Sequence, residues 1–184
     1  SLLTSTAKSP TGKMLMCASN TFLFSETHGL EPRIIHEMWD NNMHLMKFGK
    51  KIKAGETYRF SIAGSSITSA HLDDPLNEAE RLTIFAKLEG RDRLLNFHTK
   101  AWDELWKSDI TIEGDMQSQQ DIHSMLYHLY SFVREGTANS PSPMGLSGLG
   151  YNGHVFWDTE LWMFPGILQL HPELAKSMME YRYQ

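Results

Sequence analysis

Aromatic and acidic side chains lie next to one another in segment 145–165, which begins with several glycines. Phe156, Trp157, Asp158 and Glu160 are its chemically distinctive residues. An aromatic face can lie against the apolar face of a pyranose ring, while a neighbouring carboxylate accepts hydrogen bonds from vicinal hydroxyls. Both groups must project from a loop that a rigid scaffold holds in place. This combination favours a sugar-binding site.

Asp158 also has a purely structural interpretation. It can cap the helix that starts beside it, with Glu160 near the positive end of the helix dipole. For an isolated sequence, the cap is the more common role of such an aspartate. His154, which follows a glycine, is expected to be a hydrogen-bonded structural residue rather than a general base.

Several blocks of the sequence resemble glycoside hydrolase family 65, which contains inverting phosphorylases and hydrolases of α-glucosides such as maltose, trehalose and kojibiose. The blocks are GLSG (145–148), GHVFWDTE (153–160), HTKAWDELW (98–106), IEGD (112–115) and QQ (119–120). The match runs from about Ala79 to the end of the chain and includes the stretch from Pro172 to Arg182. Before Ala79 the similarity is only architectural.

The resemblance implies that Trp157 and Asp158 line the glucosyl-binding subsite, with Phe156 and Glu160 as further candidates. It places the catalytic acid, a glutamate, well downstream of this pair. Inverting hydrolysis needs that acid and a second carboxylate that activates water, whereas phosphorylases use inorganic phosphate in place of activated water. No catalytic residue is therefore expected within residues 1–184, and the chain alone is expected to be inactive.

Met144 precedes the GLSG block, where phosphorylases of this family commonly have a basic residue. This difference favours an α-glucoside hydrolase without a cofactor, and the alternative is a disaccharide phosphorylase with phosphate as co-substrate. A hydrolase would be periplasmic or secreted and a phosphorylase cytoplasmic. Two other classes remain: a non-catalytic carbohydrate-binding protein, and a helical adaptor in which Trp157 and Asp158 would be buried against each other.

Composition excludes several other kinds of partner. The net charge is −5 and no cluster of Lys and Arg is present, so a nucleic-acid surface is not expected. No apolar run is long enough to span a membrane. A single cysteine excludes an intrachain disulfide, and His123 and His128 are five residues apart, a spacing that does not suit a metal site on one helix face.

The hydrophobic periodicity changes near Asp73. Alternation around Tyr58–Ile62 predicts a strand, and further strands are expected at 14–18, 21–24 and 43–48, whereas 26–40 is ambiguous. Beyond Asp73, apolar stripes predict helices that start at Pro75, after Gly90, near Ser118 and at Pro172, with Pro165 ending or kinking the one before. Trp102 and Trp106 share a helix face and are expected to pack into a core. Segment 136–150 reads as a long loop.

The predicted fold is α+β: a β-sandwich remnant followed by the first helices of an (α/α)6 barrel. The expected domains are the end of the sandwich (1–73), a helical linker (74–117) and the beginning of the barrel (118–184). Both ends of the sequence look cut. Because an unfinished barrel would leave apolar faces around Leu126, Leu129, Met178 and Tyr181 without neighbours, the chain is expected to self-associate through its C-terminal helices.

Overall fold

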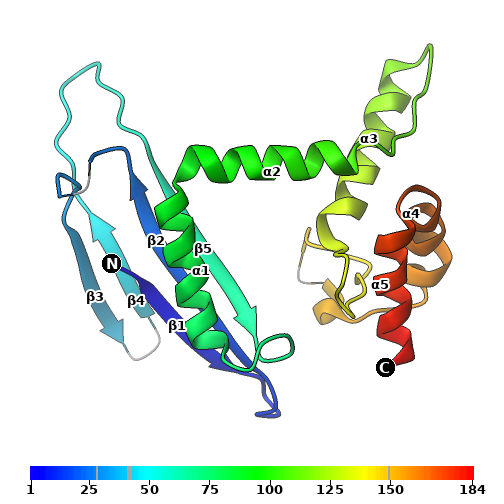
Figure 1. Ribbon diagram of the computed structural model, residues 1–184, viewed down its shortest axis with the longest axis horizontal. Helices are drawn as coiled ribbons and strands as arrows, with labels where there is room; N and C mark the ends of the chain where they lie inside the picture. Colours follow the sequence, from blue (N-terminus) through cyan, green and yellow to red (C-terminus); the bar gives the residue numbers. More distant parts are fainter. Residues whose placement is uncertain (28, 41–42, 149) are drawn as a thin grey trace. The chain divides into compact units, whose positions relative to one another are not determined.

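The computed structural model describes residues 1–27, 29–40, 43–148 and 150–184 and has an α+β fold, which confirms the predicted class (Figure 1). The chain divides into two compact units, Ser1–Thr99 and Lys100–Gln184. The division falls within helix α2 (Arg91–Leu105) and within the segment expected to be a linker. Leu149, in the segment predicted to bind sugar, and His28, in the ambiguous region, lie outside the described residues.

Antiparallel strands form the N-terminal unit. Three of them pair in the order β1-β2-β5, and two others form a hairpin; their bounds are β1 Leu3–Lys8, β2 Leu15–Phe24, β5 Phe60–Thr68, β3 Ile34–Asp40 and β4 Met43–Phe48. The strand predicted at 43–48 is confirmed, and the ambiguous region 26–40 contains β3.

Residues 14–18 and 21–24 are not two strands as predicted, because β2 continues through Ser19 and Asn20. Asn20 lies opposite Gly64 on β5, where a side chain at position 64 would overlap with the asparagine. Ser19 is fully buried, and its carbonyl accepts a hydrogen bond of 3.0 Å from the Thr83 hydroxyl. Ser19 therefore has a hydrogen-bond partner inside the fold, and the glycine at position 64 leaves room for Asn20, so neither residue interrupts the strand.

Helix α1 (Pro75–Glu89) covers one face of this three-stranded sheet (Figure 1). The Asp74 side chain caps its first turn, and Gly90 ends it with a positive φ of 76°. Ala79 and Thr83 are fully buried against the sheet, and Ser65 donates a 2.6 Å hydrogen bond to the Ala79 carbonyl. The predicted start and end of this helix are confirmed.

Helices α3 (Met116–Phe132), α4 (Phe164–Leu170) and α5 (Pro172–Tyr183) make up most of the C-terminal unit. Asp115 caps α3, so this helix begins two residues before the predicted Ser118. Pro165 lies in the first turn of α4, directly after the π-helical turn Thr159–Met163 ends, and its missing backbone N–H is tolerated at that position. Pro172 opens α5 as predicted.

The core of the C-terminal unit contains two residues that were expected to be left without neighbours. Leu126 is 5% exposed and Met178 is 2% exposed, because α3, α4 and α5 pack on one another through Tyr130 and Ile167. That part of the expectation is wrong. Trp102 and Trp106 are partly buried against the same core, as predicted, with Trp102 stacked on Tyr127 at 5.0 Å between ring centroids.

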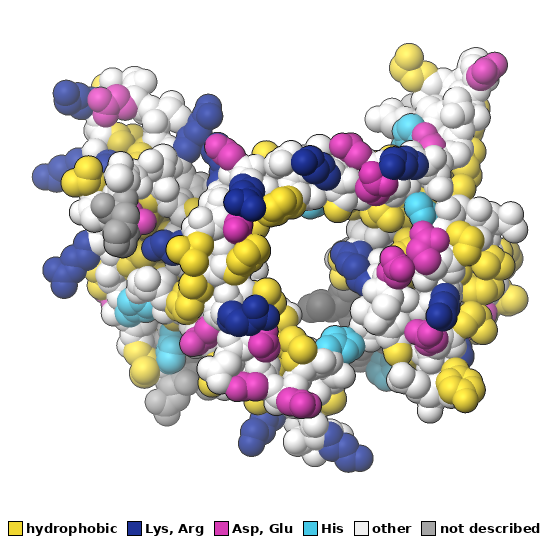
Figure 2. Space-filling view, in the orientation of Figure 1, with side chains coloured by type: hydrophobic (Ala, Val, Ile, Leu, Met, Phe, Trp, Pro, Cys, Tyr) yellow, Lys and Arg dark blue, Asp and Glu magenta, His cyan; other side chains and the backbone are white. Residues whose placement is uncertain are grey.

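Large apolar side chains nevertheless remain on the surface of this unit. Hydrophobic side chains gather over the C-terminal helices in Figure 2. The most exposed of them include Met116, Met125, Leu161, Trp162 and Tyr183. Among the described residues, every helix is too short or too polar to cross a lipid bilayer.

Candidate functional site

A tight left-handed turn leads into the predicted sugar-binding residues. Tyr151 and Asn152, within the short helical turn Gly150–Gly153, have φ values of 57° and 51°. Left-handed geometry is uncommon for a tyrosine and costs free energy that the surroundings must offset. The ring Nδ1 of His154 lies 2.7 Å from the Tyr151 carbonyl, and the His154 backbone N–H donates to the same oxygen. His154 therefore stabilises the turn, which is the structural role predicted for it.

A π-helical turn, Thr159–Met163, follows directly and runs into α4. Single π-helical turns are rare and occur frequently at functional sites, since they shift the direction of side chains along a helix. Thr159 is 1% exposed, and its hydroxyl donates a 2.8 Å hydrogen bond to the carbonyl of Pro141 in the long loop. The start of the π-turn is thus attached to the loop that precedes the site.

Asp158 occupies the position before this turn, with helical backbone angles and no capping hydrogen bond from its side chain. The alternative that Asp158 is a helix cap is therefore wrong. Its carboxylate is half-buried, and within the described ranges no hydrogen bond or ion pair to it is present. Both oxygens are available to accept hydrogen bonds from a ligand.

Trp157, the residue before Asp158 in the chain, exposes 60% of its surface. Its ring lies 6.4 Å from that of Trp162, and the two planes are tilted by 57°. Phe156 is 39% exposed and packs edge-on against Tyr151 at 5.3 Å. The exposure of Trp157 contradicts the helical-adaptor alternative, which requires Trp157 and Asp158 to be buried against each other. An exposed indole and an unpaired carboxylate on consecutive residues are the groups that a sugar ring requires.

Glu160 differs from Asp158, because an arginine of α5 binds both of its carboxylate oxygens. Arg182 Nε lies 2.6 Å from Glu160 Oε1, and Nη2 lies 3.1 Å from Oε2. The hydrogen bonds from Arg182 hold the pKa of Glu160 below its usual value. Glu160 is therefore held as an anion, and its acceptor positions are already in use.

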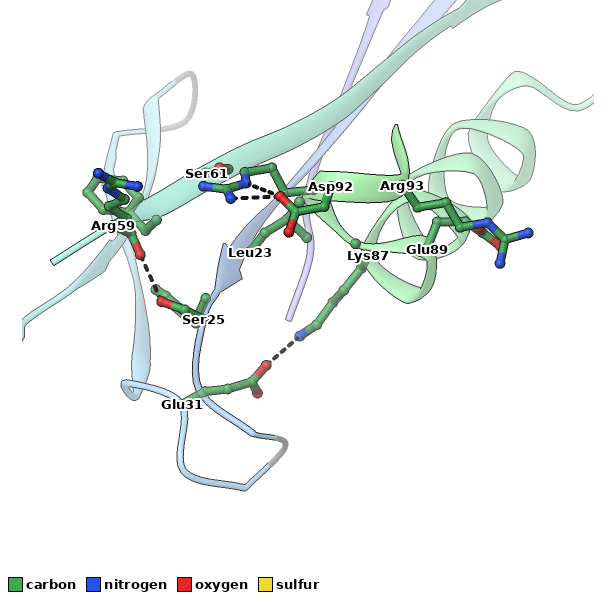
Figure 3. Close-up of a pocket in the computed structure, with 13 residues that line it drawn as sticks. Leu23, Ser25, Glu31, Arg59, Ser61, Lys87, Glu89, Asp92 and Arg93 are labelled. Carbon is green, nitrogen blue, oxygen red and sulfur yellow. Dashed lines mark hydrogen bonds and ion pairs between the residues drawn. The ribbon is translucent and has the colours of Figure 1, made fainter. Parts of the chain in front are cut away.

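A cavity of about 620 Å³ lies in the N-terminal unit, where β2 ends, β5 begins and α1 meets α2 (Figure 3). Its acidic side chains are paired with cations: Glu31 with Lys87 at 3.7 Å, Asp92 with Arg91 at 2.6 Å and Glu89 with Arg93 at 2.5 Å. These carboxylates offer fewer free acceptors to sugar hydroxyls than Asp158 does. A search of the described residues finds no group of His, Cys, Asp or Glu side chains that could hold a metal ion.

Comparison with known proteins gives a family match for the segment that contains these residues. Residues 123–184 match the glycosyl hydrolase family 65 central catalytic domain. The whole chain is 71% identical to a kojibiose hydrolase of Mucilaginibacter mallensis, over 27% of that protein's length. The chain belongs to glycoside hydrolase family 65.

Two further relatives show the range of this family. A kojibiose hydrolase of Flavobacterium johnsoniae is 67% identical over the whole chain and 27% of its own length. A kojibiose phosphorylase of Caldanaerobacter subterraneus subsp. tengcongensis is 43% identical over 78% of the chain and 19% of its own length. The chain thus spans about a quarter of the length of the curated hydrolases that it matches.

Sequence reasoning did not identify the attachments of the site. Arg182 lies in a matching block and Glu160 was a further candidate for the subsite, but the two are far apart in the chain. The hydrogen bond from Thr159 to Pro141 links residues 18 positions apart. Neither pairing has a periodic signal in a single sequence, because both depend on how α5 and the long loop pack.

Proposed function

We propose that the protein carrying this chain is an inverting α-glucoside hydrolase that acts on kojibiose, and that the chain contributes part of the subsite for the glucosyl unit. The observation that carries the proposal is the exposed indole of Trp157, followed directly in the chain by the unpaired carboxylate of Asp158. The indole would stack on the sugar ring, and the carboxylate would accept hydrogen bonds from its hydroxyls. The names of the two most similar relatives described above supply the substrate.

In this proposal, the catalytic acid and the carboxylate that activates water are residues outside 1–184. A general acid protonates the glycosidic oxygen while a carboxylate activates water on the opposite face of the sugar, and inversion follows from attack on that face. Neither Asp158 nor Glu160 takes the acid role. Glu160 is held ionised by Arg182, and Asp158 is assigned to the sugar hydroxyls.

A disaccharide phosphorylase is the second candidate, since a kojibiose phosphorylase is among the relatives. Met144 before the GLSG block and the higher identity to the two hydrolases favour water over phosphate as the nucleophile. No cofactor is needed in either reaction as proposed.

The test is product analysis with the full-length protein and kojibiose, with and without inorganic phosphate. We expect glucose to be released at the same rate in both mixtures, with the β-anomer formed first from the cleaved glucosyl unit. Phosphate-dependent formation of glucose 1-phosphate would establish the phosphorylase instead. Sugar binding without any product would mean a carbohydrate-binding protein. The 184-residue chain alone is expected to release no glucose.

A further inference from the structure

Arg182 contacts both ends of the short segment that carries Trp157 and Asp158. Its guanidinium forms a two-point contact with the Glu160 carboxylate, at 2.6 and 3.1 Å, and Nη2 also lies 3.5 Å from the carbonyl oxygen of Phe156. Phe156 and Glu160 flank the proposed sugar-binding pair in the sequence. One side chain of α5 therefore restrains the residues on either side of Trp157 and Asp158.

Thr159 restrains the same segment from another direction. Its buried hydroxyl donates to the Pro141 carbonyl at 2.8 Å, and its backbone N–H donates to the Phe156 carbonyl at 3.2 Å. The side chains of Trp157 and Asp158 have no comparable hydrogen bonds among the described residues. The backbone of the segment is thus held while its two sugar-facing side chains remain available.

We propose that Arg182 is a positioning residue of the glucosyl subsite, which acts through Glu160 and the Phe156 carbonyl to fix Trp157 and Asp158, and that Glu160 does not itself bind sugar. The inference rests on the proposed function. Both oxygens of Glu160 are occupied by Arg182, which leaves it less able than Asp158 to receive sugar hydroxyls. A planar guanidinium fixes direction as well as charge, and a lysine cannot reproduce that geometry.

The expected effects on stability and on rate distinguish a positioning role of Arg182 from a merely stabilising one. The side chains of Arg182 and Glu160 are 40% and 34% exposed, and ion pairs of this exposure contribute little to stability. A binding group displaced by about 1 Å, however, can reduce the rate of an enzyme on the order of 100-fold. Loss of Arg182 should therefore affect kinetics far more than melting temperature.

The experiment uses the full-length protein with Arg182→Met, Arg182→Lys, Glu160→Gln and the double variant Arg182→Met/Glu160→Gln. Lys176→Met is the matched control, because Lys176 pairs with Glu180 on the same helix, at 3.7 Å. Arg182→Met is expected to lower kcat/KM for kojibiose roughly 10- to 100-fold, with a melting temperature equal to that of the control. Arg182→Lys should recover part of the loss, and the double variant should be no worse than Arg182→Met alone.

Two results would overturn the inference. If Arg182→Met has the same kcat/KM as Lys176→Met, Arg182 does not position the site. If the losses for Glu160→Gln and Arg182→Met multiply in the double variant, Glu160 contacts the sugar independently. Asp158→Asn, measured in parallel, tests the proposed function separately, because an unimpaired Asp158→Asn removes the subsite assignment whatever Arg182 does.

A second measurement does not depend on activity. The near-ultraviolet circular dichroism of Trp157 reports its orientation relative to Trp162, whose ring lies 6.4 Å away. Arg182→Met should change this signal in the wild-type background and leave the spectrum unchanged when Trp157 has been replaced by phenylalanine. A Trp157 signal that is the same with and without Arg182 would contradict the positioning role even if the substrate proves to be another sugar.

Discussion

The carboxylates of Asp158 and Glu160 are two residues apart and have different surroundings. Asp158 has no partner among the described residues, whereas Glu160 is bound at both oxygens by Arg182. A carboxylate whose acceptors are free can bind a ligand at little cost, and one already paired must first give up its partner. Residue type alone makes the two equivalent, and only the packing of α5 distinguishes them.

The pairing of Glu160 predicts a pH dependence of stability. Arg182 lowers the pKa of Glu160 in the folded chain, so its stabilising contribution is present above the unfolded value of 4.5 and is lost as pH falls through the folded value. Because the pair is partly exposed, this contribution is small, and Arg182→Met should reduce the loss of melting temperature on acidification only slightly. The measurement is melting temperature between pH 7 and pH 3, with Lys176→Met as the control. An acid limb that is identical in wild type and Arg182→Met would contradict it.

At the scale of the elements, α3 contributes Leu126 and Tyr130 to the core of the C-terminal unit, and the Asp115 side chain caps its first turn. The Asp115 carboxylate accepts hydrogen bonds from the backbone N–H groups of Gln117 and Ser118, at 3.0 and 3.2 Å. Asp115→Ala should lower the free energy of unfolding by about 0.5–2 kcal/mol, as measured by urea denaturation.

Two further variants test whether the lost cap is the cause of the lower stability of Asp115→Ala. Asp115→Asn should retain most of the stability, because asparagine is also a good cap, and Glu113→Ala removes the same charge two residues earlier from an exposed side chain. A loss in Glu113→Ala equal to that in Asp115→Ala would show that charge, and not the cap, is responsible.

Helix starts were predictable from the sequence where a cap or a proline marks them, as at Asp74 and Pro172. The continuity of β2 and the π-turn at Thr159–Met163 could not be predicted from the sequence, because both depend on contacts with residues distant in the chain. Ser19 and Asn20 look like strand breakers until Thr83 and Gly64 are placed beside them. The segment proposed to bind sugar was identified from its residue types and its family resemblance, whereas its hydrogen bonds to Pro141 and Arg182 could be seen only in the packed structure.

At the scale of the whole molecule, apolar surface on the C-terminal unit remains a reason to expect association. Leu126 and Met178 are buried, but Met125, Leu161, Trp162 and Met179 expose between 47% and 70% of their surface. Apolar patches beyond a few hundred Å² commonly form interfaces. Of the other residues first named, Tyr181 is 37% exposed and Leu129 is partly buried against the core, so the prediction of self-association now rests on Tyr181 together with the exposed side chains named above.

Light scattering of the 184-residue chain across a concentration series tests this prediction. We expect the average mass to rise with concentration and the rise to be reduced by Trp162→Gln. Trp39→Gln is the matched control, because Trp39 is similarly exposed, at 68%, on β3. A constant monomer mass at high micromolar concentration would show that these side chains do not drive association.

The most direct test of the sugar-binding role is kcat/KM for kojibiose in the full-length protein and its Asp158→Asn variant, with melting temperatures measured alongside. The loss of a charged acceptor for a sugar hydroxyl should cost about 1.5–3 kcal/mol of transition-state stabilisation, roughly a 10- to 100-fold lower kcat/KM. The melting temperature should hardly change, because Asp158 makes no capping bond. A variant with normal kcat/KM and a clearly lower melting temperature would contradict the assignment of Asp158 to the glucosyl subsite.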